Sequence, residues 1–225
     1  MRAGRFPANR NETIYMAELG PASSRRLLDL TATRYLVVDR SELNALDGLQ
    51  PPLSPVRTVG ETQVLENASA LPRAFFVPRV EVVADSRALL ERLAVGPDDP
   101  RTVALVEAAP SDFLGLPGDG SGADVRFVVD DPEHVELAVN APARGFLLLS
   151  DQYDTGWRAW VNGQPAAITR GNYTFRLVEV PAGRSTVEFR YRPAGLLAGA
   201  GISVLAIAAA VLVVRRAATA QARSS

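Results

Sequence analysis

The sequence predicts a mainly β protein: an extracytoplasmic β-sandwich with one or two short helices, followed by a single C-terminal transmembrane helix. Short apolar segments recur at intervals of roughly 8 to 12 residues with turn-forming residues between them, which is typical of a sandwich. Residues 194–214 carry no charge, which is typical of a membrane helix. The predicted parts are an N-terminal connector with a short helix and strand (1–50), the β-sandwich domain (51–193), the transmembrane helix (194–214) and a cytoplasmic tail (215–225).

The first 55 residues contain signals for one helix, one strand and a boundary. The segment from Pro21 to Leu30 has Ser23 or Ser24 as a capping residue and leucines on one side, so it predicts a short helix. Residues 34–38 form a short apolar run that favours a buried strand. Residues 41–55 are rich in glycine and proline, which favours a domain boundary there.

The sandwich region shows the period-two alternation of half-buried strands. Val187, Phe189 and Tyr191 share one face of their strand, with charged residues between them. Asn162 and Gly163 separate two such runs and predict a two-residue hairpin turn, because both residue types tolerate positive φ. The predicted strands are 62–66, 73–77, 80–83, 102–107, 125–129, 135–139, 146–149, 157–161, 166–169, 173–180 and 186–192.

One helix is expected to cross this β-rich region. Asp85 can cap it, because its side chain can accept hydrogen bonds from the first turn. Leu89, Leu90 and Leu93 are expected on one face of the helix, which should end before Gly96.

The uncharged segment 194–214 would form a helix about 31 Å long, which matches the roughly 30 Å of hydrocarbon in a bilayer. Gly195, Gly199 and Ser203 recur every four residues and favour close packing against another helix. The run ends in Arg215 and Arg216, and such arginines tend to stay cytoplasmic, so the tail is expected inside and the domain outside. Because residues 1–20 contain no secretory signal, this orientation predicts that further membrane helices precede the segment in a longer protein.

Composition argues against several kinds of chemistry. The formal net charge is −1 and no basic stripe is present, so we expect no nucleic-acid partner. The chain has no cysteine, which excludes disulfides and thiolate sites. His134 is the only histidine, and its acidic segment favours a solvated turn over a cation site. We therefore expect no metal and no cofactor.

The densest set of chemically active side chains lies in residues 150–160. Asp151 and Asp154 stand among aromatic residues, a pattern that is found where paired carboxylates hydrolyse sugars. Strand alternation places Trp157 and Trp160 on opposite faces, so at most one of them belongs to the core. An exposed Trp160 could stack on a sugar with Tyr153 or sit in the lipid interface. Three interpretations stay open here, namely structural packing, contact with a ligand or the interface, and catalysis, and the candidate ligand-binding residues are Asp151, Tyr153, Asp154 and Trp160.

Three ordered motifs resemble the C-terminal region of bacterial YfhO-family membrane proteins. The first lies within residues 66–75 and contains Asn67, Pro72 and Arg73. The second runs from Ser150 through Gly156-Trp157 to Asn162-Gly163, and the third spans residues 181–193. The resemblance covers residues 61–214 and implies a multi-pass protein similar to membrane-embedded glycosyltransferases that use lipid-linked sugars. It also implies that the catalytic acidic residues lie near the first helices, outside this chain, and that Gly156 and Trp157 are structural.

Two functional hypotheses follow from these observations. In the first, the chain is the outer domain and terminal anchor of a YfhO-like glycosyltransferase, non-catalytic itself, which positions a glycan acceptor or braces the preceding helices. In the second, it is a membrane-anchored sandwich that binds a glycan or a protein. The expected partners are the lipid bilayer, an N-terminal transmembrane bundle and a glycan or lipid-linked sugar.

Overall fold

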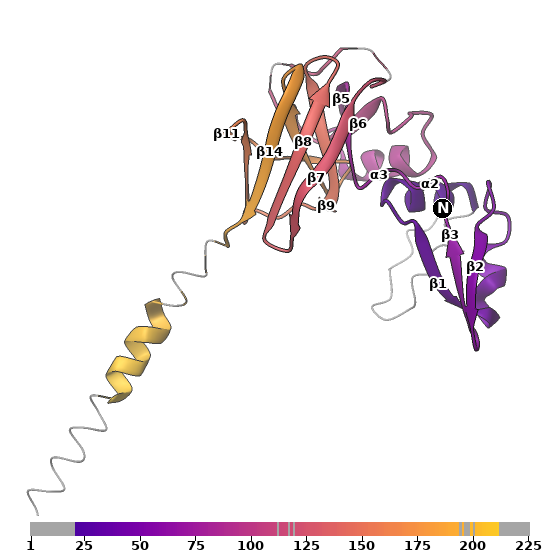
Figure 1. The fold of residues 1–225 in the computed structure, drawn as a ribbon, viewed down its shortest axis with the longest axis horizontal. Coiled ribbons are helices and arrows are strands. Elements are labelled where there is room, and N and C mark those ends of the chain that lie inside the picture. The colour runs from indigo at the N-terminus through magenta and orange to yellow at the C-terminus, as the bar shows by residue number, and fades with distance from the viewer. Residues whose placement is uncertain are drawn as a thin grey trace, which may run out of the picture.

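A computed structural model describes residues 21–111, 113–116, 118, 120–193, 195, 199 and 201–211 of the chain. The fold is mainly β, as the sequence predicts, with its strands arranged in three sheets (Figure 1). In chain order the elements are α2 (Pro21–Leu30), β1 (Tyr35–Asp39), η1 (Arg40–Leu46), β2 (Ser54–Val59), β3 (Thr62–Glu66), β4 (Ala74–Val77), β5 (Arg79–Val82), α3 (Ser86–Val95), β6 (Val103–Val106), β7 (Asp124–Asp131), β8 (His134–Ala141), β9 (Gly145–Gln152), β10 (Trp157–Val161), β11 (Gln164–Ala166), β12 (Thr169–Gly171), β13 (Phe175–Val180) and β14 (Gly183–Tyr191).

Two sheets pack face to face and form the sandwich. The outer sheet has the order β11-β10-β14-β8-β7, and the central sheet has the order β4-β9-β13-β12-β6-β5. Their facing side chains alternate with outward-pointing ones along β8 and β14, which is why these strands read clearly in the sequence. The apolar cluster between the sheets contains Ala74, Phe76, Val135, Leu137, Val139, Ala141, Leu147, Leu149, Ala159, Val178, Val180, Val187 and Phe189.

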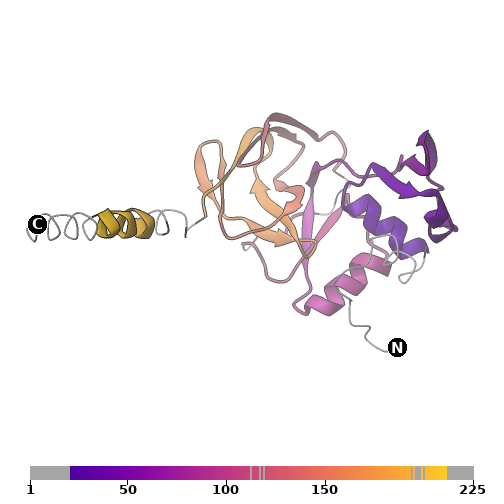
Figure 2. The ribbon, with the colours of Figure 1, turned by 90° about the horizontal axis from the view of Figure 1, so that it is seen from below.

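The central sheet is buried on both faces. Its second face packs against α2 and α3, which lie next to each other on the side away from the outer sheet (Figure 2). Leu89 and Leu93 of α3 contribute to this second cluster, as does Leu30 of α2. Four consecutive residues of β9, Phe146 to Leu149, are therefore fully buried, because one side of the strand faces the outer sheet and the other faces the helices.

The third sheet is formed by β1, β3 and β2 in that order, with antiparallel pairing throughout. Tyr35 of β1 pairs with Glu66 of β3. The predicted boundary between residues 50 and 51 falls between β1 and the two strands that complete its sheet. The sequence did not predict β2, an edge strand whose six residues are all exposed and which contains Pro55.

Four local predictions need correction. The strand expected at 34–38 is not buried: in β1, Tyr35 and Val37 are exposed and only Val38 is buried, because this strand lies in the separate three-stranded sheet. Helix α2 begins at Pro21 and not after Ser23 or Ser24, because proline suits the first helical turn, where its missing N–H has no intrahelical partner. Leu90 of α3 is 40% exposed, while Leu89 and Leu93 are buried. The predicted strand at 166–169 is divided between β11 and β12, because the chain passes there from the outer to the central sheet.

The C-terminal end of the described chain is helical over residues 201–211, and all of these residues are exposed. Within the described residues, no helix has the length and apolar character needed to cross a membrane. The connector 1–20 and the tail 215–225 lie outside the described residues. Of the predicted span 194–214, the structure describes only Gly195, Gly199 and residues 201–211.

Candidate functional site

Four charged side chains connect the two sandwich sheets where β9 ends and β10 begins. Arg73, next to β4, donates from Nε to Asp151 Oδ1 (2.7 Å) and from Nη2 to Asp151 Oδ2 (2.9 Å). Its Nη1 donates to both carboxylate oxygens of Asp130 on β7, at 2.9 and 2.8 Å. Arg176 of β13 donates from Nη2 to Asp151 Oδ2 (2.6 Å). We name Arg73, Asp130, Asp151 and Arg176 the arginine–aspartate clasp.

Arg176 is the buried centre of this clasp, with 3% of its side chain exposed. Its guanidinium carbon lies 3.8 Å from the centroid of the Trp157 ring and 5.2 Å from that of Phe189. Within the described residues, Nε and Nη1 have no hydrogen-bond partner, so the ring faces supply the attraction that oxygens would otherwise give. Burial lowers the pKa of Arg176 to about 10, while Asp151 acts in the opposite direction and Arg73 in the same direction as burial.

The turn before β10 positions the indole ring beneath Arg176. Asp154 Oδ1 accepts a hydrogen bond from the backbone N–H of Gly156 (2.7 Å). A Cβ atom at Gly156 would lie 2.5 Å from the Tyr191 ring, so only glycine allows this approach. Trp157 then lies between Arg176 and Tyr191, whose ring centroid is 5.2 Å away. Asp154 also raises the pKa of the Tyr191 phenol, mainly through its negative charge.

The two candidate carboxylates therefore have different partners. Both oxygens of Asp151 accept hydrogen bonds from guanidinium groups, whereas Asp154 holds a turn. A cavity of about 250 Å³ adjoins the clasp, and Trp157 and Asp131 are among its lining residues. Because the charge of Asp151 is neutralised by arginine, the arrangement is suited to joining the sheets.

Trp160 lies on the outer face of the outer sheet, opposite the sandwich core. Its backbone pairs with Glu188 of β14, and Arg190 lies 6.0 Å from its ring centroid. Tyr153 instead directly follows β9 of the central sheet, and its backbone N–H donates to Thr174 O (2.6 Å). The structure thus places Trp160 on the outer sheet and Tyr153 at the end of a central-sheet strand.

The same outer face carries His134, which the sequence favoured as part of a solvated turn. His134 begins β8, and its Nε2 lies 2.8 Å from Glu188 Oε1. With Glu136 these residues could each offer one metal ligand within 4.8 Å of the others. Arg190 Nε also donates to Glu188 Oε1 (2.6 Å), so an arginine already balances one of the two carboxylates.

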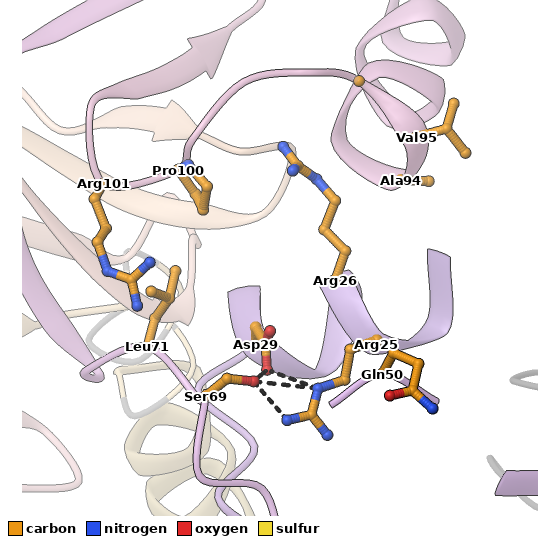
Figure 3. A pocket seen from close by; sticks show the side chains of 11 residues that line it. Arg25, Arg26, Asp29, Gln50, Ser69, Leu71, Ala94, Val95, Pro100 and Arg101 are labelled. Carbon is orange, nitrogen blue, oxygen red and sulfur yellow. Dashed lines mark hydrogen bonds and ion pairs between the residues drawn. The ribbon is translucent and has the colours of Figure 1, made fainter. Parts of the chain in front are cut away.

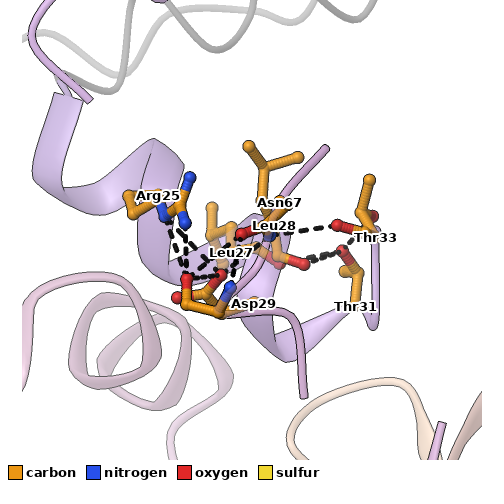
Figure 4. A network of polar contacts seen from close by, with 8 residues as sticks. Arg25, Leu27, Leu28, Asp29, Thr31, Thr33 and Asn67 are labelled. Carbon is orange, nitrogen blue, oxygen red and sulfur yellow. Dashed lines mark hydrogen bonds and ion pairs between the residues drawn. The ribbon is translucent and has the colours of Figure 1, made fainter. Parts of the chain in front are cut away.

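The first sequence motif ties β3 to α2 (Figure 4). Asn67 is 1% exposed and donates from Nδ2 to Asp29 Oδ1 (2.8 Å) and to Thr33 O (3.0 Å). Its own Oδ1 accepts from the Ser69 N–H (3.2 Å). Pro72, which follows in the motif, is exposed at the approach to β4.

The remaining motif residues form a turn and a helix face. Asn162 and Gly163 have φ values of 51° and 76° in the turn between β10 and β11, as the hairpin signal predicts. Ser203 Oγ donates to Gly199 O (2.9 Å). A Cβ atom at Gly195 or Gly199 would meet no atom within 4 Å.

Sequence reasoning missed Arg176, Asp130 and Tyr191 as members of this site. For Arg176 a signal was present: it is in register with Val178 and Val180, which face the sandwich core. A charged residue on an apolar strand face predicts a buried partner of opposite charge. Nothing in the local sequence, however, indicates that this partner is Asp151.

Residues 125–203 match the family model of the bacterial membrane protein YfhO. The match covers about a third of the chain, from β7 through β14 to the first described residues of the C-terminal helix. It includes Gly156, Trp157 and the Asn162-Gly163 turn and confirms the predicted resemblance over this region. No curated protein and no solved structure matches the chain.

Proposed function

We propose, because residues 125–203 are a YfhO-family region, that this chain is the C-terminal extracytoplasmic domain and last membrane helix of a multi-pass YfhO-like protein. The observation that carries this proposal is the continuity of the family match from the sandwich into the C-terminal helix. Only two residues, Arg192 and Pro193, separate the end of β14 from the uncharged segment. The sandwich would therefore lie close to the membrane surface.

The exposed apolar side chains of residues 201–211 support insertion of this segment into lipid. Ile202 is 68% exposed, Leu205 is 71% exposed and Ile207 is 65% exposed. Water is a poor solvent for such a surface, whereas lipid or a neighbouring helix would cover it. The open stripe of Gly195, Gly199 and Ser203 would face the preceding helices, with Arg215 and Arg216 on the cytoplasmic side.

The proposed role of the whole protein is the transfer of sugars from lipid-linked donors to cell-envelope glycans, with this part non-catalytic. The engagement of Asp151 by two arginines and of Asp154 by a backbone turn supports the non-catalytic assignment. In this proposal the clasp and Trp157 keep the two sheets together, and the domain positions the acceptor or braces the bundle.

A second candidate function is a membrane-anchored binding module for a glycan or a protein. The partly exposed Trp160, with Arg190 and Glu188 beside it, favours this alternative, because aromatic rings with nearby charged groups bind sugars. Glycan-array binding that disappears with Trp160→Ala, while the fold persists, would favour the module. Glycan binding that persists in Trp160→Ala would show that Trp160 does not contact the glycan, and the binding-module hypothesis would lose the observation that favours it.

The topology can be tested in cells that produce the protein in its natural length, with an epitope tag after Ser225. Protease added to spheroplasts should cut within residues 21–193, while the tag stays protected until the cells are lysed. Alkaline carbonate should leave the protein in the membrane pellet. Protection of the domain, or release of the protein by carbonate, would contradict the proposal.

The non-catalytic assignment can be tested with Asp154→Asn in the same protein. We expect sugar incorporation into envelope glycans to stay within about twofold of wild type, because the asparagine oxygen can still accept the Gly156 hydrogen bond. A complete loss of transfer at unchanged protein level would identify Asp154 as catalytic.

A further inference from the structure

We propose that the hollow between α2, the C-terminal end of α3 and the loop before β6 binds a phosphate monoester, held by Arg25, Arg26 and Arg101. The hollow has a volume of about 420 Å³, which is within the range of small-molecule sites. Figure 3 shows Arg26 extending from α2 and Arg101 from the loop before β6, on two sides of the space above Asp29 and Ser69. The site precedes residue 125, so it does not depend on the proposed membrane role.

Arg25 is the buried donor at this site, with 4% of its side chain exposed. Nε and Nη2 donate to Ser69 Oγ at 3.1 and 2.5 Å. Nη1 is buried and has no hydrogen-bond partner in the described part of the chain. A buried guanidinium with an unpaired donor is costly, and the negative charge of an anion in the adjoining hollow would offset part of that cost.

Among the described residues that line the hollow, the single acidic one, Asp29, forms an ion pair with Arg25 and offsets only one of the three arginine charges. Asp29 Oδ1 accepts hydrogen bonds from Asn67 Nδ2 and Ser69 Oγ, both at 2.8 Å. It lies 3.7 Å from Arg25 Nε, too far for a hydrogen bond. Three cations and one carboxylate therefore leave the lining with an excess of two positive charges.

No carboxylate among the described residues accepts a hydrogen bond from the side chain of Arg26 or Arg101, so their guanidinium groups can donate to a bound anion. Arg26 donates from Nε to Leu93 O and from Nη2 to Asp98 O, each at 2.5 Å, so its partners are neutral carbonyls. Arg101 has 57% of its side chain exposed, and its Nη1 lies 3.9 Å from Asp99 Oδ1. The bond from Arg26 to Leu93 O also occupies a carbonyl that would otherwise repel an anion at the end of α3.

These features fit a dianion attached to a small organic group. Guanidinium groups bind phosphate and carboxylate in a bidentate manner, and an excess of two positive charges matches a phosphate monoester better than a singly charged diester. Leu71, Val95 and Pro100 supply an apolar part of the wall for the organic group. A sugar phosphate is the simplest ligand of this class.

Isothermal titration calorimetry of the full chain in an uncharged detergent tests the site, with glucose 1-phosphate as the probe. Glucose tests the need for the phosphate, and glycerophosphoglycerol represents a phosphodiester such as a lipid headgroup. We expect saturable binding of glucose 1-phosphate, at least about tenfold weaker binding of the diester, and none of glucose.

Substitutions locate the binding. Arg101→Gln should weaken glucose 1-phosphate binding by about tenfold while leaving the thermal midpoint unchanged, because its side chain is exposed and its ion pair with Asp99, at 3.9 Å, is screened by water. Arg26→Gln should weaken it by a similar factor. Arg87→Gln, on the exposed side of α3, is the matched control and should change nothing. Absence of saturable binding, tighter binding of the diester, or equal loss in Arg87→Gln would each overturn the proposal.

Discussion

The guanidinium group of Arg176 lies over the indole ring of Trp157, 3.8 Å from its centroid, and so joins the central sheet to the outer sheet inside the sandwich. This contact explains why the Gly156-Trp157 pair belongs to a recognisable motif. The glycine permits the turn, and the tryptophan covers a buried charge. Among the described residues, Asp151 is the one carboxylate at hydrogen-bond distance from that charge.

Removal of that counter-charge should destabilise the fold. We expect Asp151→Asn to lower the free energy of unfolding by about 3 kcal/mol, because it leaves Arg176 buried without a carboxylate. Asp130→Asn should cost less than about 1 kcal/mol, since Asp130 is 50% exposed and its ion pair is screened by water. Urea titration of the two variants measures both values, and equal losses would show that burial does not set the strength of the clasp.

The two tryptophans should differ in their effect on stability. Trp157→Leu removes the ring between Arg176 and Tyr191 and should cost about 2 to 3 kcal/mol of unfolding free energy. Trp160→Leu changes the outer face and should cost less than about 1 kcal/mol. Denaturant unfolding followed by circular dichroism separates them, and a larger loss for Trp160 would mean that its face is covered.

Close approach at Gly156 predicts a steric penalty. Gly156→Ala would bring a methyl group to 2.5 Å from the Tyr191 ring, so we expect a loss of about 1 to 3 kcal/mol. Gly118→Ala is the matched control, because its Cβ would meet only ordinary contacts with Pro78 at 3.7 and 4.0 Å. Thermal unfolding of both variants provides the comparison, and an unchanged midpoint for Gly156→Ala would show that Tyr191 can move aside.

Acid should weaken the attachment of α3 to its surroundings. Arg92 donates from Nε and Nη2 to Asp98 (2.6 and 2.8 Å) and lowers the pKa of that carboxyl group. The pKa of Glu81 is also lowered, first by Arg79 and then by Arg92. A carboxyl pKa that is lower in the folded state contributes stability above its unfolded value, and this contribution is lost as the pH falls through the folded value.

The unfolding free energy should therefore fall as the pH drops below about 4, the usual range of carboxyl groups. Arg92→Gln should flatten this dependence, because the two carboxyl groups lose the donor that they share. Arg87→Gln on the same helix should retain the wild-type profile. Chemical denaturation in a pH series gives the slopes, and parallel profiles for wild type and Arg92→Gln would refute the assignment.

The sandwich strands could be predicted because one of their faces is buried. In β8 and β14 apolar and polar side chains alternate, and this period appears directly in the sequence. Strand β2 gave no such signal, since none of its residues is buried. In β9 the strand was clear, but the helices on its second face come from residues 21–30 and 86–95, and no local pattern connects them to Leu148.

The arginine–aspartate clasp also depends on contacts between distant segments, which no local sequence pattern reveals. Asp151, Arg73 and Trp157 were each singled out by local motifs, but the ion pair joins Arg73 and Asp151 across 78 positions. The buried charge that unites them, Arg176, lies in the predicted strand 173–180, in which the sequence predicted no site residue. Pairing of β13 with β9 brings it beside Asp151, and only the sheet order supplies that information.

The position of β14 has a mechanical consequence. Among the described strands this is the last one before the C-terminal helix. It pairs with β8 over Gly183–Arg190 on one side and with β10 over Val187–Tyr191 on the other. A pull on the C-terminus would load both ladders in shear, so that many hydrogen bonds must break together before the strand can slide. The chain thus leaves the sandwich from the strand best placed to resist tension.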